Sequence, residues 1–397
     1  MVKIALLLIF CTSLSAQAGL NEWNLNDISY LYSLPKLASQ TPEHLMTPQD
    51  SESNGALLPL EVYKYVPNVV AGSGNIRIYE KNLKVIGVRV DPCPSFDKNN
   101  CGPAEVRMIW QPVEYDKDFN AWHGRDGAVH SFYHLGKKEM NSLLKELWNL
   151  KLKNQSNGIN TKKLPLNIHP AMSDKKFVKQ LNKTFLKYCG KKNLKKVTFM
   201  SLLVATRWWR FGSLELQSDG TWMRVQIPRT DLKFIDIFNT ASEGRPANNI
   251  PGKAMDAMFN IFAEDYPQRD IIFPIINNSY RQNNDSDKEV FASKLDAIYR
   301  FRNPHRTNPG TLDCASCHFA DPALFYATRR FPDLAQITSE DKYLNPAPKL
   351  FNLENTTIAK KATRIVRAFG YFGDKAAINQ RTINESAAVS HWLNSRK

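Results

Sequence analysis

The strongest constraint on this chain is a five-residue motif, Cys-Ala-Ser-Cys-His, at residues 314–318. Cys-x-x-Cys-His is the attachment pattern of a c-type haem, because two thiols add across the two vinyl groups of one porphyrin and the adjacent imidazole reaches the iron from the same side. With 6 Cys and 8 His among 397 residues, a chance match is expected on the order of two times in a thousand such chains. The motif therefore predicts one covalently bound haem c, and redox or ligand chemistry with it.

The N-terminus fits the compartment in which c-type haem is attached, which lies outside the cytoplasm. Lys3 supplies a positive start, residues 4–14 an apolar core, and Ala16-Gln17-Ala18 a cleavage site of the A-x-A type. The apolar run is too short to span a bilayer, and no later segment approaches the about 20 apolar residues of a transmembrane helix. We therefore expect a cleaved secretory signal at residues 1–18, no transmembrane segment, and a periplasmic or secreted protein.

The remaining cysteines fit an oxidising compartment. Cys93 and Cys101 flank a loop rich in turn residues, and in such a compartment they are expected to form a local disulfide bond. The alternative is two unrelated reduced thiols. Cys189 is then unpaired and is expected to be a small buried hydrophobic residue.

The formal net charge of +15 is concentrated in one stretch, where residues 162–196 contain eleven lysines and one acidic residue, Asp174. One interpretation is docking to an acidic redox partner protein or to an anionic envelope surface, through attraction that salt would weaken. The other is a solvated helix face that keeps the protein soluble. Nucleic acid is a poor partner, because the chain is expected to be exported and these lysines lack interleaved aromatic residues.

The residue pattern predicts an α+β fold whose parts follow one another along the chain. After the signal, residues 19–59 are rich in polar and turn residues and are expected to form an extended lead-in. Residues 60–300 are expected to form a mixed α/β body domain that is rich in β-strands and contains several helices. Residues 301–397 are expected to form a small all-α unit that contains the motif.

Strands are predicted from alternating apolar residues at 83–90 and 106–111, from aromatic and β-branched content at 128–135, and as a hairpin within 213–227. Helices are predicted at 137–151, 174–188, 253–264, 286–300 and 384–393. A further helix is predicted to start at Asp321-Pro322, with Asp321 as the N-cap and Pro322 in the first turn.

The C-terminal unit resembles a mono-haem cytochrome c domain, since it opens with the attachment motif, continues with a helix and closes with a terminal helix. The resemblance covers about the last 95 residues of the chain and is specific at the motif alone. It implies that Cys314 and Cys317 form the thioether bonds and that His318 is the proximal iron ligand. The preceding body domain resembles no known family.

The segment after the motif departs from that family, whose second axial ligand is usually a downstream methionine. Residues 319–397 contain no methionine and one histidine, His391, which on the terminal helix lies opposite the apolar face. The sixth site may therefore be open, which suits peroxide or small-gas chemistry, whereas two strong ligands favour outer-sphere electron transfer. If a ligand comes from elsewhere in the chain, the candidates are His305 and His130, with His123 and His134 after them.

Three functions follow. The first is an exported c-type haem protein in electron transfer or haem-based redox sensing, with Arg302 and Arg306 as partners of the haem propionates. The second is a peroxidase-like oxidoreductase with an open iron site, for which the sequence identifies no catalytic residue. The third is a non-haem envelope binding protein stapled by disulfides. Zinc binding is disfavoured because no second ligand pair lies nearby, and thiol–disulfide exchange because the motif lies outside a βαβ pattern.

Overall fold

The computed structural model describes residues 22–66, 82–96, 101–203, 208–228, 233–239, 259–261, 285–361 and 365–396. The predicted signal at residues 1–18 lies outside these residues, as does most of the helix predicted at 253–264. Residues 22–59, for which we expected an extended lead-in, contain a short helix and three strands, and they bury Trp23, Leu25 and Ile28 in the main core.

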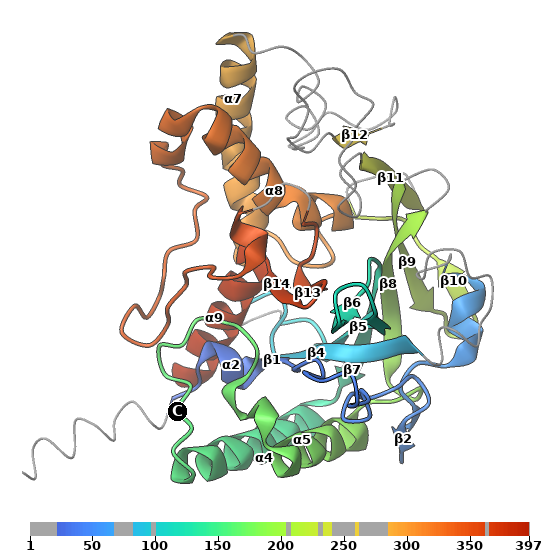
Figure 1. Cartoon of the computed structure of the whole chain (residues 1–397). Helices are drawn as coiled ribbons and strands as arrows, with labels where there is room; N and C mark the ends of the chain where they lie inside the picture. Colours follow the sequence, from blue (N-terminus) through green and yellow to red (C-terminus); the bar gives the residue numbers. More distant parts are fainter. Residues whose placement is uncertain are drawn as a thin grey trace, which may run out of the picture.

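The centre of the fold is a large antiparallel β-sheet (Figure 1). Its main path in the described residues runs β1-β4-β5-β7-β8-β9-β11-β12, with β10 paired to β9 and β6 to β5. The strands are β1 (Ser29–Leu31), β4 (Leu83–Asp91), β5 (Ala104–Asp116), β6 (Ala121–Gly124), β7 (Ala128–Leu135), β8 (Leu194–Leu203), β9 (Trp208–Leu216), β10 (Trp222–Arg224), β11 (Phe234–Asn239) and β12 (Phe259–Ile261). Two small hairpins pair β2 (Ser51–Glu52) with β3 (Gly55–Ala56) and β13 (Phe369–Phe372) with β14 (Lys375–Ile378).

Helices α4 (Lys137–Ser156) and α5 (Lys175–Tyr188) cover one face of this sheet, at the bottom of Figure 1. Successive side chains of a strand point to opposite faces. Val129 and Tyr133 of β7 share the main core with Leu143 of α4 and Phe185 of α5. The alternate residues of β7, Ala128, His130 and Phe132, line a cleft on the other face instead.

That other face is covered by the C-terminal helices α7 (Asp285–Arg302), α8 (Cys314–Arg330) and α9 (Gln380–Asn394). A second core cluster joins Phe291 of α7 and Phe319 of α8 to Trp209 and Phe211 of the sheet. Helix α9 packs beside the N-terminal helix α2 (Leu25–Ile28). The remaining helical elements are short 3₁₀ turns, η1 (Leu60–Lys64), η2 (Pro170–Ser173), η4 (Pro332–Gln336) and η5 (Ile358–Lys361).

The coarse α+β prediction is confirmed, and so are the helices at 137–151 and 174–188 and the hairpin within 213–227. The separate all-α C-terminal unit is not confirmed, because the hairpin β13–β14 lies within it. Of the helix predicted at 253–264, the described residues Phe259–Ile261 form strand β12. Cys93 and Cys101 form the expected disulfide bond, and Cys189 is buried and unpaired. Within the described part of the chain, no helix is long and apolar enough to cross a bilayer.

The prediction that a helix starts at Asp321-Pro322 is wrong. Helix α8 starts earlier, at Cys314, because the carboxylate of Asp313 caps it and accepts a hydrogen bond from the backbone N–H of Ser316 at 2.8 Å. Pro322 therefore lies inside the helix. Asp321 instead accepts a hydrogen bond from the backbone N–H of Gln380 at 2.7 Å and forms an ion pair with Arg302, so it joins α8 to α9 and α7.

Candidate haem site

The motif residues occupy the first turns of α8. Positions i, i+3 and i+4 of a helix lie on the same face, so the helix brings Cys314, Cys317 and His318 together. All three line a cleft between α8 and the sheet. The cap at Asp313 fixes where the helix begins, and with it the face that these three side chains share.

His318 is held in a defined orientation. Its Nδ1 donates a hydrogen bond to the backbone carbonyl of Val366 at 2.6 Å. Because a carbonyl can only accept, Nδ1 carries the proton and Nε2 keeps a free lone pair, which is how metal-binding histidines are usually oriented. Burial lowers the pKa of His318, so the ring is neutral at pH 7.

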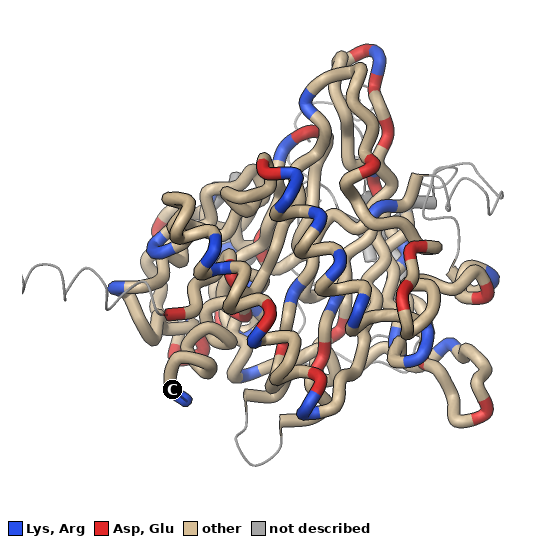
Figure 2. The backbone as a smooth tube through the Cα atoms, turned by 90° about the horizontal axis from the view of Figure 1, so that it is seen from below, with Lys and Arg blue, Asp and Glu red and all other residues tan. Residues whose placement is uncertain are grey.

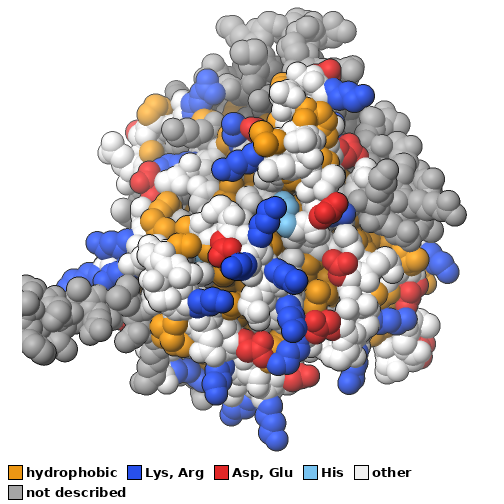
Figure 3. All heavy atoms as spheres, turned by 60° about the horizontal axis from the view of Figure 1, so that its bottom comes forward, with side chains coloured by type: hydrophobic (Ala, Val, Ile, Leu, Met, Phe, Trp, Pro, Cys, Tyr) orange, Lys and Arg blue, Asp and Glu red, His pale blue; other side chains and the backbone are white. Residues whose placement is uncertain are grey.

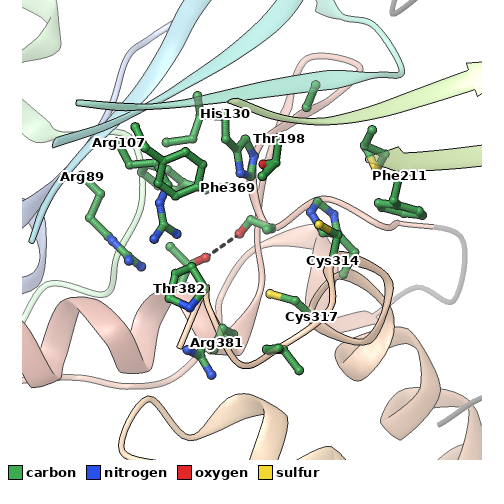
Figure 4. A pocket seen from close by; sticks show the side chains of 18 of the residues that line it. Arg89, Arg107, His130, Thr198, Phe211, Cys314, Cys317, Phe369, Arg381 and Thr382 are labelled. Carbon is green, nitrogen blue, oxygen red and sulfur yellow. Dashed lines mark hydrogen bonds between the residues drawn. The ribbon is translucent and has the colours of Figure 1, made fainter. Parts of the chain in front are cut away.

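The opposite wall of the cleft is one face of the sheet (Figure 4). Ile109 of β5, His130 of β7 and Thr198 of β8 are paired across three adjacent strands, so they form a row on that face. Met200 of β8 and Phe211 of β9 extend this wall beside α8. The cleft contains about 870 Å³ of free space, part of it open to solvent.

His130 faces His318 across this cleft. Their ring centroids are 6.0 Å apart and their planes are inclined by 26°. A metal bound about 2 Å from one nitrogen of each imidazole would place the two ring centroids roughly 6 Å apart. Burial, followed by the nearby His318, Arg107 and Arg89, holds the pKa of His130 well below its usual value, so this ring is neutral too. Both rings would be available as neutral nitrogen ligands to a metal bound in this cleft.

The two thiols are unpaired and protonated. Burial raises the pKa of Cys314 to about 12 and also raises the pKa of Cys317. Thiol–disulfide exchange requires the opposite shift, toward the thiolate, and Cys314 and Cys317 are not joined by a disulfide. Nor does the described part of the chain contain three or more His, Cys, Asp or Glu side chains grouped to bind a metal ion, and a structural zinc site needs four such ligands together.

One end of the cleft is strongly charged. Arg89 of β4 pairs with Glu385 of α9 and with Asp91 at 3.2 Å. Arg381 of α9 pairs with the same Glu385 at 2.9 Å. Arg107 of β5 lies above the ring of Phe132, with 4.6 Å between its Cζ atom and the ring centroid. These side chains would meet the polar edge of a bound ligand.

The other predicted ligand candidates lie elsewhere. His305 is exposed, and its ring packs against Tyr343 and Phe96 at 5.7 and 5.3 Å between centroids. His123 is 3.5 Å from Asp116, on the hairpin of β5 and β6. His134 does not line the cleft, although it is on the same strand as His130. Among the candidates, His130 alone lies in the cleft with the motif.

The arginines predicted to bind propionates are also outside the cleft. Arg302 forms an ion pair with Asp321 at 2.9 Å, and Arg306 with Asp341 at 3.0 Å. The arginines of the cleft are Arg89, Arg107 and Arg381. The sequence held no signal for two of them, because Arg89 and Arg107 alternate with apolar residues in their strands just as Lys84 does.

The chain matches no protein-family model, no curated protein and no solved structure.

Proposed function

We propose that this protein binds one haem c through Cys314 and Cys317 and acts in electron transfer or haem-based redox sensing. The observation that carries the proposal is the meeting of two thiols and two imidazoles in one cleft, from segments almost 200 residues apart. His318 is the proximal ligand, as in the mono-haem cytochrome c domains that the motif resembles. His130 is the sixth ligand, and it comes from the sheet rather than from the segment after the motif.

When bound, the haem supplies a one-electron ferric/ferrous couple. The hydrogen bond from His318 to Val366 orients one ligand, and the pairing of β7 with β5 and β8 orients the other. If His318 and His130 both hold the iron, no position would be left for a substrate, which would favour outer-sphere electron transfer over peroxide chemistry. Met200 and Phe211 contribute buried apolar side chains to the walls of the cleft, which would limit the access of water to a bound haem.

The proposal includes export, since c-type haem is attached outside the cytoplasm and the disulfide between Cys93 and Cys101 requires an oxidising compartment. It also includes a role for the lysine-rich face, defined as the exposed lysines of residues 162–196. Lys and Arg side chains are spread over the side of the molecule formed by α4 and α5 (Figures 2 and 3). Because the sheet separates this face from the cleft, it suits an anionic envelope surface better than a redox partner that must approach the iron.

The first experiment is haem staining after denaturing electrophoresis of the protein expressed with a haem-attachment system. Covalent haem survives denaturation, so the wild-type band is expected to stain, and Cys317→Ala is expected to weaken the stain or abolish it. A wild-type band without haem would overturn the proposal and leave a non-haem envelope binding protein. A fully stained Cys317→Ala band would contradict the assigned thioether.

The second experiment tests the sixth ligand by absorption spectroscopy. The wild-type protein is expected to be six-coordinate and low-spin, and His130→Ala is expected to become high-spin or to bind added cyanide. His134→Ala is the matched control, because it removes a histidine from the same strand outside the cleft. A high-spin wild-type protein that reacts with peroxide would favour the peroxidase-like alternative instead.

A further inference from the structure

We propose that Arg107 and Arg89 bind the two carboxylate groups of the ligand in this cleft, so that the haem lies with its propionate edge at β4 and β5 and its vinyl edge at α8. This inference rests on the proposed function and adds the orientation of the group. The positive charges that balance the carboxylates would then come from strands β4 and β5, which are far in sequence from the motif.

The placement of the two kinds of anchor supports this orientation. Arg89 and Arg107 are directly paired across the antiparallel strands β4 and β5. In Figure 4 they lie at one end of the cleft, whereas Cys314 and Cys317 lie toward the other. A porphyrin of this type carries its vinyl groups and its propionates toward different edges of one flat ring. A cleft that binds it needs thiols at one end and cations at the other.

Both arginines have an unused donor. The Nε atoms of Arg89 and Arg107 are buried and have no hydrogen-bond partner, although the side chains are 3% and 12% exposed. Asp91 and Glu105, which pair with the guanidinium groups, do not line the cleft, whereas Glu385, which also pairs with Arg89, does. Buried polar groups are nearly always paired in native proteins. Two unpaired donors on neighbouring strands therefore indicate an acceptor that binds there.

The charge of the lining has the sign that carboxylates require. Four cationic side chains and two carboxylates line the cleft, and the two histidines are neutral. One of the carboxylates, Asp313, is already used as the cap of α8. Guanidinium groups bind carboxylates through parallel hydrogen bonds, so the arginines suit propionates better than lysines would.

The test uses a full-length Cys314→Ala, Cys317→Ala variant, which binds porphyrin without a covalent bond, and compares haem b with its dimethyl ester. The ester has the same ring and iron but no carboxylates. With the native arginines, haem b is expected to bind at least about tenfold more tightly than the ester, as for loss of one charged hydrogen bond. Arg107→Gln is expected to remove most of this preference, and Arg107→Lys to keep part of it. Arg306→Gln, an exposed arginine outside the cleft, is the control and is expected to keep all of it.

Each result separates this inference from the function on which it rests. If the protein with its native arginines binds haem b and the dimethyl ester with equal affinity, the inference is overturned. This result does not depend on whether any arginine variant folds. A preference that survives Arg107→Gln unchanged also overturns it. Absence of haem from the wild-type chain in the stained gel overturns the proposed function instead. In the haem-loaded wild-type background, Arg107→Gln is expected to keep the stain and to lower the reduction potential. A cation near the haem stabilises the reduced iron, because reduced iron carries less positive charge than oxidised iron. Losing that cation therefore disfavours reduction.

Discussion

A buried ion pair between Lys151 of α4 and Asp27 of α2 offers the most quantitative test of this fold. The two charged atoms are 2.6 Å apart, and the side chains are 3% and 2% exposed. Asp27 also accepts hydrogen bonds from the hydroxyl of Thr161 and the backbone N–H of Asn24, both at 2.8 Å. The pair ties the N-terminal helix α2 to the helices under the sheet, and α2 in turn packs against α9, which forms one wall of the cleft.

Lys151→Met removes the cation and leaves the Asp27 carboxylate buried with neutral donors only. Breaking such a pair from one side costs about 3–5 kcal/mol of the free energy of unfolding. Lys187→Met is the matched control, because its pair with Glu146 has the same 2.6 Å distance but side chains that are 53% and 33% exposed. Exposed pairs contribute less than about 1 kcal/mol. The prediction is therefore a difference of several kcal/mol between two substitutions that are chemically identical.

The assay is urea unfolding followed by tryptophan fluorescence, with both variants and the wild type measured in the same buffer. A Lys151→Met, Asp27→Asn double variant is expected to recover much of the loss, because it removes both buried charges. If Lys151→Met costs no more than Lys187→Met, the pair is not buried in solution as described, and the proposed contact of α2 with the rest of the fold is wrong.

Three further predictions concern other parts of the molecule. Replacing Cys93 and Cys101 by Ser opens a loop with a sequence separation of 8, and urea unfolding is expected to show a loss of roughly 2–3 kcal/mol. His169 is buried with its pKa lowered to about 4 and accepts a hydrogen bond from the backbone N–H of Ala171 through Nδ1. The unfolded chain therefore binds more protons between about pH 6.5 and 4, so stability falls as the pH falls through this range. His169→Asn is expected to flatten that slope in unfolding curves measured at several pH values. Co-sedimentation of the protein with anionic vesicles is expected to weaken when salt is added. It is also expected to weaken in a variant in which Gln replaces three exposed lysines of α5, namely Lys175, Lys179 and Lys183. Neutral vesicles are expected to bind neither the wild type nor the variant.

Local sequence was sufficient for the elements and for one half of the candidate site. The strand at 128–135 was predicted from its aromatic and β-branched residues, and β7 occupies that range. Residues 314–318 are close enough in sequence to show their shared chemistry without a fold. The start of α8 was placed too late, because an Asp-Pro pair within the helix resembles a helix start as closely as the true cap at Asp313 does.

The other half of the site depends on contacts between distant segments. His130 and His134 are four residues apart on the same strand and have the same local composition, so the sequence does not distinguish them as ligands. What separates them is the docking of α8 against the middle of β7, where His130 meets His318. The arginines show the same limit. Arg302 and Arg306 were proposed because guanidinium groups suit carboxylates, without any geometry, whereas Arg89 and Arg107 reach the cleft through the pairing of β4 with β5.

The charged end of the cleft also carries a cost in stability that a bound anion would offset. Burial, and after it the neighbouring Arg107, lowers the pKa of Arg89 to about 9, and burial lowers the pKa of Arg381 to about 10. A lowered pKa of a cationic group means that its charged form is less stable in the folded protein than in water. Hydrophobic residues at these positions would avoid that cost, so stability alone does not explain why a sheet carries arginines there. An anionic ligand bound at this end would offset the cost and would stabilise the folded state by its own binding free energy. On the proposed function, α8 would supply the covalent bonds and the sheet would supply a counter-charge that is fully stabilised once the ligand is attached.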